Sequence, residues 1–305
     1  MTLGVIGNVN ADLLVWPASE IPPPGVERSV DRIDLRAGGA AAITGAVLAR
    51  LGADAVVVGC VGDDALGAAV VNELRGYGVD TGHVHVIADA STGTSIAFEA
   101  PGRERSFFIS LGSLAAFEPS MVPDEALQAA SVLFCGYFNL PGMRGRPTAA
   151  LLRRAKESGA TTFLDTGWDH DGWPRSTRQE IRELLPLVDV FVPNEIEVRH
   201  LSGESDTFAA ARTLTGWSAG WTVVKLGAEG CLAAGPDGQT HRVSAPAVEV
   251  IDTTGAGDAF NAGLMVALSA GRAVPTGLRK AVQLASAVVS RPSNDRYPTP
   301  EQVRP

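Results

Sequence analysis

The segment "VIDTTGAGDAF" (residues 250–260) places two aspartates on either side of a glycine-rich turn, and an apolar run typical of a helix follows it. Gly255 and Gly257 leave their backbone N–H groups without steric cover. A helix N-terminus adds unpaired N–H groups and partial positive charge. This combination predicts a pocket for an anion. A carboxylate beside such a pocket repels the anion, so Asp258 is expected to have another task, such as accepting a proton.

The elements that must position this turn are short apolar runs that alternate with helix-like segments. The runs include "LGVIG", "AVVVGCVG", "SVLFCGYF", "TTFLDTG", "DVFVPN" and "WTVVKLG". Such an alternation predicts an α/β fold, in which helices cover both faces of a mostly parallel sheet. Ligands bind these sheets at the carboxyl ends of the strands. The polar residues at those ends are the site candidates: Asn10, Asp12, Asn139, Asp165, Asn194, Lys225 and Asp252.

Two stretches interrupt this alternation and look like twisted strands and turns. They are residues 15–37 and 92–112, and the second contains "TSIAFEA" and "RSFFIS" around a "PGR" turn, the pattern of a β-hairpin. Neither stretch is long enough for a domain, and no linker divides the chain. We therefore expect a single domain, residues 1–305, with a small β-sheet lid formed by about residues 12–38 and 90–113.

The composition narrows the class of protein and its partners. A net charge of −9 without a basic tract argues against a nucleic acid as the main partner. The first residues carry no basic leader and no apolar run approaches the length of a membrane span, so a cytoplasmic protein without a membrane partner is expected. Cys60, Cys135 and Cys231 lie far apart and form no C-x-x-C pair, which predicts buried thiols.

The segment "VFVPNEIEV" allows two interpretations. Asn194 and Glu197 lie one helical turn apart, on the same face of a helix. An amide and a carboxylate at the end of a strand can hold hydrated Mg²⁺ on phosphate oxygens. The same residues also suit the start of a helix, with asparagine as the N-cap and glutamate in the first turn. The residue types alone favour the helix start.

The segment "VVKLGAEGC" is similarly open. Lys225 can meet a phosphate as a point charge, and Gly227 and Gly230 let the backbone approach a nucleotide. The alternative is a β-hairpin turn with an exposed lysine. The chain contains no G-x-x-x-x-G-K-[ST], so it is not a P-loop protein. It also lacks G-x-G-x-x-G after the first strand, which disfavours a dinucleotide-dependent oxidoreductase.

A family resemblance joins these motifs. "DTTGAGDAF" resembles the C-terminal signature of the ribokinase-like (PfkB) carbohydrate kinases. "GNVNAD" resembles the family's substrate segment, "AGGAAAITGAVLARLG" its Gly-Gly loop, and "VGCVGDDALG" its first signature. "NEIE" matches its N-x-x-E motif, and "KLGAEG" its nucleotide-binding turn. The motifs run through nearly the whole chain in the family's order, which makes the resemblance specific and implies the ribokinase-like fold.

The resemblance implies the activity and the role of each candidate residue. The family uses ATP and Mg²⁺ to phosphorylate a hydroxymethyl group of a sugar, sugar acid or nucleoside. Asp258 would take the proton of that group, and the amides of Gly255, Ala256 and Gly257 would stabilise the transferring phosphoryl group. The remaining implied roles are substrate binding by Asn10, Asp12, Gly38, Gly39 and Asn139; ATP binding by Asn194, Lys225, Gly227 and Gly230; Mg²⁺ binding by Asn194 and Glu197; and binding of a monovalent cation such as K⁺ by Asp252 and Thr254, with a second cation loop in "SRPSNDRYP".

One departure from the family bears on the substrate. The loop "GGAAAIT" has Ile43 near the place of an asparagine that contacts the substrate in the family, and it carries no lysine or arginine for a sugar phosphate. This departure disfavours ribose and sugar phosphates as substrates and leaves room for a less polar ligand such as a nucleoside. The family resemblance leads us to expect an ATP-dependent kinase of a sugar or sugar acid, with a nucleoside kinase as the alternative. A non-catalytic sugar or nucleotide sensor on the same fold is a further alternative. Members of the family often dimerise through such lids, and an exposed sheet edge gives a physical reason. The resemblance therefore suggests a homodimer.

Overall fold

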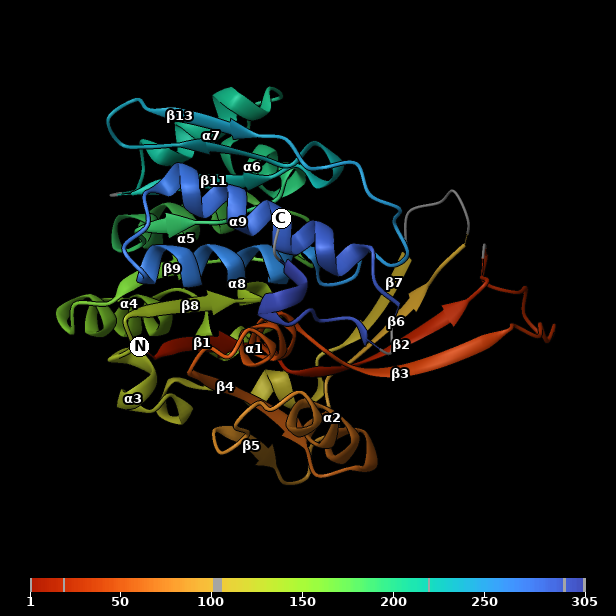
Figure 1. Cartoon of the computed structure of the whole chain (residues 1–305). Coiled ribbons are helices and arrows are strands. Elements are labelled where there is room, and N and C mark those ends of the chain that lie inside the picture. Colours follow the sequence, from red (N-terminus) through yellow and green to blue (C-terminus); the bar gives the residue numbers. More distant parts are fainter. Residues whose placement is uncertain (1, 19, 101–105, 219, 293–294, 304–305) are drawn as a thin grey trace.

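The computed structural model describes residues 2–18, 20–100, 106–218, 220–292 and 295–303. These residues form a large sheet covered by helices, and a smaller sheet projects from one side of it (Figure 1). The turn of the predicted hairpin, residues 101–105, and residues 293–294 of the expected cation loop lie outside the described residues.

Within the described residues the large sheet has nine strands: β1 (Leu3–Gly7), β4 (Ala55–Gly62), β5 (Val84–Ile87), β8 (Ser131–Cys135), β9 (Thr161–Leu164), β10 (Val190–Phe191), β11 (Trp221–Lys225), β12 (Cys231–Ala234) and β13 (Thr240–Val243). Their order is β13-β12-β11-β10-β9-β8-β1-β4-β5. Neighbours from β5 to β11 pair in parallel, while β12 and β13 each pair antiparallel with the preceding strand. The predicted mostly parallel sheet is confirmed.

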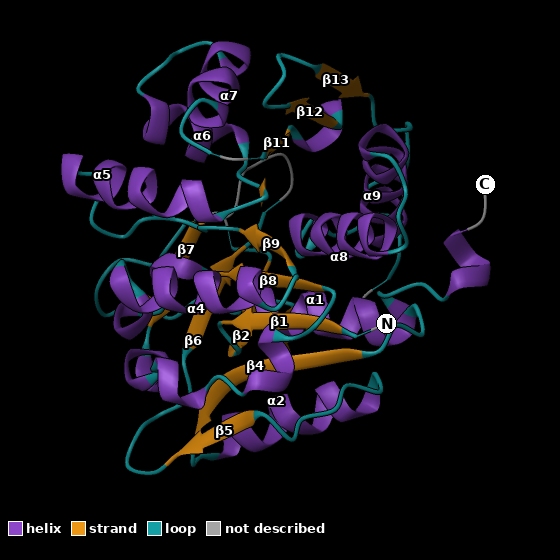
Figure 2. Cartoon of the chain, turned by 90° about the vertical axis from the view of Figure 1, so that its left-hand side faces the viewer, coloured by secondary structure: helices purple, strands orange, loops and turns teal. Residues whose placement is uncertain are grey.

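Helices cover both faces of this sheet, as the alternating pattern predicts. One face carries α1 (Ala40–Arg50), α2 (Ala65–Gly76), α8 (Ala256–Ser269) and α9 (Val274–Val289). The other face carries α3 (Asp124–Leu127), α4 (Arg146–Glu157), α5 (Arg175–Leu184), α6 (Glu195–Ser202) and α7 (Thr207–Thr215). Figure 2 shows α4 and α5 on the opposite side of the strands from α8 and α9. Each face has its own hydrophobic core, because successive side chains of a strand point to opposite faces.

The smaller sheet is built from two separate parts of the chain. Its strands are β2 (Asn10–Trp16), β3 (Arg32–Gly38), β6 (Thr94–Phe98) and β7 (Ser106–Ser110). In the order β3-β2-β6-β7, the two middle strands pair in parallel and the outer pairs are antiparallel. β6 and β7 are the two strands of the predicted hairpin. The sheet projects beyond the end of the large sheet at which β1 leads into β2 (Figure 1).

Two other expectations concern the core and membranes. The three cysteines are buried and carry free thiols, as predicted. Burial raises the pKa of the Cys60 thiol to about 11, so this thiol is not reactive at neutral pH. Across the part of the chain that the structure describes, no helix is long and apolar enough to cross a membrane.

Candidate active site

Parallel pairing brings together polar residues that are distant in the sequence. Asn8 follows β1, Asn139 follows β8, Asp165 follows β9 and Asn194 follows β10, while Lys225 ends β11. The carboxyl ends of parallel strands meet at one edge of the sheet, so these side chains gather there. Asn194 and Lys225 also form an isolated parallel bridge, which places the starts of two adjacent loops side by side.

A chain of amide and carboxylate groups lines the start of the smaller sheet. Asn8 Nδ2 donates to Asn10 Oδ1 at 3.0 Å, and Asn10 Nδ2 donates to Asp12 Oδ1 at 2.7 Å. Asn8 Oδ1 in turn accepts the N–H of Ala40 at the start of α1, at 3.1 Å. These bonds hold Asp12 in one orientation, as a group that aligns substrate hydroxyls must be held. The sequence predicted roles for Asn10 and Asp12 but missed Asn8, which orients them.

The Gly-Gly pair has a steric reason in this structure. A Cβ atom on Gly38 would lie 2.2 Å from the Asp12 carboxyl carbon, and one on Gly39 would lie 2.4 Å from the carbonyl oxygen of Asn8. Gly39 also has a φ of 91°, which side chains rarely tolerate. Both glycines therefore allow the chain to pass close to the polar residues. Their contribution to substrate binding stays a prediction.

A cavity of about 250 Å³ lies between the smaller sheet and the carboxyl ends of the large-sheet strands. Three of its walls are polar and come from the segments after β1, from β6 and from the segment after β8. An apolar wall comes mainly from β7 and from the loop after β9. The lining residues are Asn8, Asn10, Asp12, Gly39, Thr94, Ser95, Phe107, Ile109, Ser110, Leu114, Asn139 and Trp168. Four residues with a predicted substrate role (Asn10, Asp12, Gly39 and Asn139) thus share one cavity.

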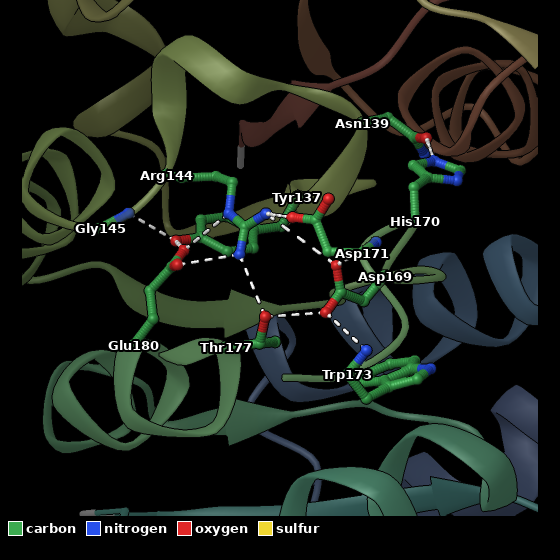
Figure 3. Close-up of polar contacts among 10 residues, drawn as sticks. All are labelled: Tyr137, Asn139, Arg144, Gly145, Asp169, His170, Asp171, Trp173, Thr177 and Glu180. Carbon is green, nitrogen blue, oxygen red and sulfur yellow. Dashed lines mark hydrogen bonds and ion pairs between the residues drawn. The ribbon is translucent and has the colours of Figure 1, made fainter. Parts of the chain in front are cut away.

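The loop that carries Trp168 is attached through a polar cluster (Figure 3). Arg144 donates to both carboxylate oxygens of Glu180, at 3.1 and 3.0 Å, and to the Thr177 hydroxyl at 3.3 Å. The Thr177 hydroxyl donates to the buried carboxylate of Asp169 at 2.7 Å. This network fixes the wall of the cavity, because Asp169 lies next to Trp168 in the chain.

Asn139 has a hydrogen-bond partner in the loop that carries Trp168. Its Oδ1 lies 2.7 Å from Nε2 of His170, and Figure 3 shows the imidazole directed at the amide. Because Asn139 lines the cavity, His170 orients it there in the way that Asn8 orients Asn10. A substrate contact of Asn139 stays a prediction.

The glycine-rich turn begins α8 and is flanked by two cationic side chains. Gly255 is the N-cap of α8, with a left-handed φ of 73°. A Cβ on Gly255 would lie 3.5 Å from Nη2 of Arg296, and a Cβ on Gly257 would lie 3.5 Å from Nζ of Lys225. The backbone amides, the positive end of the helix and the two side chains all favour an anion at this turn. The sequence pointed to the turn and to Lys225, but not to Arg296.

Lys225 is held by a residue to which the sequence assigned no role. Its ammonium group donates to Asp165 Oδ2 at 2.5 Å, and Asn261 Nδ2 of α8 donates to the same oxygen at 2.6 Å. The predicted β-hairpin turn is present, since β11 and β12 pair antiparallel, but the lysine is largely buried and the expectation of an exposed lysine is wrong. Asp165 thus fixes the lysine beside the glycine turn. Its position at a strand end was the only signal in the sequence.

The carboxylates at this site raise one another's pKa. Burial raises the pKa of Asp258 to about 7, and the negative charge of Asp165 adds to the shift, while Lys225 and Arg296 oppose it. The negative charge of Asp12 also contributes to the raised pKa. Burial would lower the pKa of Lys225, but Asp165 and Glu197 raise it above its usual value. At neutral pH the site therefore holds a lysine that is charged and an aspartate that is poised to exchange a proton.

Asn194 and Glu197 form a capping box at the start of α6. Asn194 Oδ1 accepts the N–H of Glu197 at 2.9 Å, and Glu197 Oε2 accepts the N–H of Asn194 at 2.9 Å. Glu197 is buried, and burial together with Asp165 raises its pKa to about 8. The structural alternative for this motif is thus present, and Mg²⁺ binding stays a prediction. Among the described residues, no group of three or more histidine, cysteine or acidic side chains is placed to hold a metal ion.

The two glycines of the predicted nucleotide turn differ. Gly227 has a left-handed φ of 57°, and a Cβ there would meet no atom within 4 Å. A Cβ on Gly230 would lie 1.9 Å from the carbonyl oxygen of Val243, so glycine is required there for the packing of β12 against β13. Open space beside Gly227 is compatible with a bound nucleotide. The glycine at position 230 is explained by this strand packing without a bound nucleotide.

Ile43, which stands near the place of the family's asparagine, does not line the cavity. It is buried in α1, and its Cγ2 would lie 2.8 Å from a Cβ on Gly255. The side chain therefore packs against the glycine-rich turn of residues 255–257, which we call the anion turn. Its apolar character has a role in packing rather than in substrate contact.

Comparisons with known proteins show the family of the chain. A sequence model of the pfkB family carbohydrate kinases matches residues 2–301. The chain is 29% identical to the ribokinase of Haemophilus influenzae over 273 residues, which cover 88% of this chain and 85% of the relative. It is 31% identical to the aminoimidazole riboside kinase of Salmonella typhimurium over 242 residues, which cover 76% and 73%.

The fold has close counterparts among solved structures. The structure of Arabidopsis thaliana ribokinase complexed with ribose and ATP superposes with a TM-score of 0.84 at 27% identity, over 99% of this chain and 96% of that chain. The fold and the site thus define a ribokinase-like α/β phosphotransferase that acts on an alcohol group. The chain belongs to the pfkB family of carbohydrate kinases.

Proposed function

We propose that this enzyme transfers the γ-phosphoryl group of ATP to a hydroxymethyl group of an uncharged sugar. The observation that carries the proposal is the cation-flanked glycine turn, with Asp258 in the first turn of α8, together with the cavity lined by Asn10 and Asp12. The turn suits a phosphate, and the amide and carboxylate groups suit vicinal hydroxyls. A sugar acid is less favoured, because no lysine or arginine is among the cavity residues that the structure describes.

The proposed chemistry follows from these positions. Asn10 and Asp12 would orient the sugar so that its hydroxymethyl oxygen lies between Asp258 and the turn. The hydroxyl proton passes to Asp258, the oxygen forms a bond to the γ-phosphorus, and the bond from that phosphorus to the bridging oxygen of ADP breaks. The amides of Gly255, Ala256 and Gly257, together with Lys225, would stabilise the charge on the transferring group.

The nucleotide and its metal would bind on the far side of the turn. Asn194, Lys225, Gly227 and Gly230 are the proposed ATP residues. Asn194 and Glu197 offer an amide and a single carboxylate, a donor set that suits Mg²⁺ when water and phosphate oxygens complete its shell. When bound there, Mg²⁺ would neutralise charge on the phosphates.

The smaller sheet is proposed as a lid of the single domain that residues 1–305 form. Its strands contribute Asp12, Ser95 and Ile109 to the cavity from one face, because the register places these three residues opposite one another. Closure of such a sheet over the substrate would exclude water, which competes as phosphoryl acceptor.

The opposite face of the smaller sheet supports the proposed homodimer. Leu35, Leu13, Ile96 and Phe108 lie in one row across the four strands and point away from the cavity side. Phe108 is 56% exposed and Leu35 is 41% exposed. A contiguous apolar face on a sheet with two open edges is best covered by a second copy of the same face.

A nucleoside is the second candidate substrate. It is favoured by the apolar wall of the cavity, where Phe107, Ile109 and Trp168 face the polar residues. An aromatic base could stack on this wall while the ribose contacts Asn10 and Asp12.

A substrate screen tests the proposed function. The purified protein is incubated with ATP and Mg²⁺ and with neutral sugars, sugar acids or nucleosides, and products that are heavier by one phosphoryl group are detected by mass spectrometry. A phosphorylated neutral sugar supports the first proposal. Preferential phosphorylation of a nucleoside, reduced at least tenfold by Trp168→Ala, supports the second, since base stacking contributes roughly 1–3 kcal/mol. Tight binding of a sugar without any product would contradict both and identify a sensor.

A further inference from the structure

The loop before the glycine turn holds two guanidinium groups where the family resemblance implies a monovalent cation. Asp252 Oδ2 accepts from Nη1 of Arg36 at 2.6 Å, and Asp252 Oδ1 accepts the N–H of Thr254 at 2.9 Å. The carbonyl oxygen of Thr254 accepts from Nη2 of Arg296. Nη2 of Arg296 also lies 4.0 Å from Asp252 Oδ2. The oxygens that would ligate the ion are thus bonded to the protein's own donors.

Arg296 is fixed at this place. Its side chain is only 4% exposed, and its guanidinium carbon lies 5.5 Å from the ring centre of Tyr297. Tyr297 is itself buried and packs edge-on against Tyr77, with ring centres 4.9 Å apart. The main-chain oxygen of Tyr297 accepts from Nε of Arg50 at 3.1 Å. A guanidinium held in this way is a permanent cation rather than a mobile surface charge.

Arg36 reaches the same loop from the smaller sheet. It lies on β3, opposite Asp12 of β2, and its side chain is 11% exposed. Burial would lower the pKa of Arg36, but the hydrogen bond and the charge of Asp252 raise it. The ion pair therefore connects the strand pair that carries Asp12 to the loop that leads into α8.

The residues present do not fit a monovalent cation. An ion bound between Asp252 and Thr254 would lie within a few ångströms of two fixed positive charges and would compete with them for the same oxygens. The positive charge that a monovalent cation would contribute is already supplied by Arg296, which lies near Gly255 at the start of the anion turn.

We propose that Arg296, assisted by Arg36, replaces the monovalent cation beside the anion turn, so that this kinase binds its nucleotide without needing K⁺. Arg296 would hold the carbonyl group of Thr254, and with it the amides of the turn, and its charge would favour the transferring phosphoryl group. Arg296 is thereby a positioning residue for the turn. This inference rests on the proposed phosphotransfer activity.

The first experiment measures the dependence on K⁺ of the unaltered protein. Affinity for a non-hydrolysable ATP analogue with Mg²⁺ is determined by calorimetry in KCl and in choline chloride at equal ionic strength, and turnover is compared in the same salts once a substrate is known. We expect less than a twofold difference in both quantities. An affinity or turnover that rises tenfold or more with K⁺ would overturn the proposal. A protein that binds no ATP analogue in either salt would instead contradict the proposed kinase function.

The second experiment removes the charge. Arg296→Met should weaken binding of the analogue in choline by about tenfold, the effect of losing one charge-assisted interaction, and K⁺ should now restore part of the loss. Arg296→Lys keeps a cation and should lose less affinity than Arg296→Met. Arg279→Met removes an exposed arginine of α9 and should behave like the unaltered protein. Melting curves identify any variant that does not fold.

The outcomes of the second experiment separate a cation role from packing. If Arg296→Met and Arg296→Lys lose affinity equally and neither responds to K⁺, the arginine acts only through packing and the proposal fails. The salt comparison on the unaltered protein needs no variant, so it decides the question even if Arg296→Met is unstable.

Discussion

At the scale of single residues, the site is a set of like and unlike charges whose pKa values depend on one another. The charges that act on Asp258 are the carboxylates of Asp165 and Asp12 and the cations of Lys225 and Arg296. Two neighbouring carboxylates favour its protonated form, and two cations favour the ionised form. The residue is therefore poised near neutrality, where a general base is most effective.

The proposed catalytic role of Asp258 predicts the effect of Asp258→Asn. Turnover should fall by 10²–10⁴-fold, the usual contribution of a general base. Affinity for ATP should hold or increase slightly, because a negative charge beside the phosphates is lost. Turnover and nucleotide affinity are measured on one preparation, and a turnover within a few-fold of the unaltered enzyme would refute the catalytic assignment.

The same substitution should stabilise the protein at pH 8. The pKa of Asp258 is raised from 3.8 to about 7 in the folded state, so the folded protein binds more protons than the unfolded chain between these values. Stability from this group is thus lost as the pH rises through that window. Asparagine carries no charge that would have to be buried. The Asp258→Asn protein should therefore have a higher melting temperature than the unaltered protein at pH 8, and the difference should be smaller at pH 5. A lower melting temperature at both pH values would favour a purely structural aspartate.

The pH profile of the reaction should reflect the coupling between carboxylates. Since the base must be ionised, kcat/KM is expected to rise with pH, with a midpoint near 7 in the free enzyme, following the pKa of Asp258. Asp165→Asn removes the second cause of the raised pKa and should move the midpoint to lower pH. A structural role of Asp165 alone would lower the activity without moving the midpoint, so profiles of the two enzymes decide the question.

At the scale of elements, α6 shows how one motif can serve both a helix and a ligand. The capping box of Asn194 and Glu197 satisfies backbone donors at the start of the helix, and the charges of Asp165 and Lys225 act on the buried carboxyl group of Glu197. The helix start and a metal site therefore use the same residue types, and the geometry of the cap does not exclude the second use.

Glu197→Gln distinguishes these roles. The change keeps the shape of the side chain and removes its charge, so the Mg²⁺ concentration for half-maximal activity should rise at least several-fold. Glu195→Gln makes the same charge change in the same helical turn, where Glu195 forms an exposed ion pair with Arg199, and serves as the control. If the Glu197 variant has an unaltered Mg²⁺ curve and only a lower melting temperature, Glu197 is a capping residue and not a metal ligand.

At the scale of the whole molecule, the smaller sheet has two faces with different surroundings. One face contributes to the cavity, while the other presents the apolar row that ends in Phe108. Phe98 and Phe108 pack edge-to-face at 5.7 Å on this outer face. The same sheet would thus close the site and join two copies of the chain.

Two neighbouring phenylalanines of β7 test this division. Phe108→Ser should convert a dimer into a monomer, because it removes an exposed aromatic side chain from the apolar face on the edge strand β7, while KM changes little. Phe107 lies on the opposite face and lines the cavity, so Phe107→Ser should raise KM and leave the dimer intact. Light scattering after size-exclusion chromatography gives the mass of each variant. A monomeric unaltered protein at micromolar concentration would contradict the proposed dimer.

Much of the fold and part of the site were determined by contiguous stretches of the sequence. The apolar runs predicted the parallel sheet, and "TSIAFEA" and "RSFFIS" predicted the hairpin, because strand and turn preferences act between neighbours in the chain. "DTTGAGDAF" predicted a glycine-rich turn at the start of a helix, and α8 begins there. Asn139 was recognised as a strand-end residue, and strands of one parallel sheet end at a common edge. Asn10 and Asp12 were expected at the end of the first strand, whereas they lie in β2 of the smaller sheet.

The tertiary structure alone decided which charges meet. Asp165 and Lys225 are 60 residues apart, and Arg36 and Asp252 are 216 residues apart, so no local pattern links either pair. The apolar wall of the cavity likewise depends on Phe107 and Trp168, which come from β7 and from the loop after β9. Burial of an ion pair is a property of the packed chain, since the sequence carries the charges but not the distances between them. For this reason the sequence predicted a cation beside the anion turn, whereas the folded chain shows two arginines at that place.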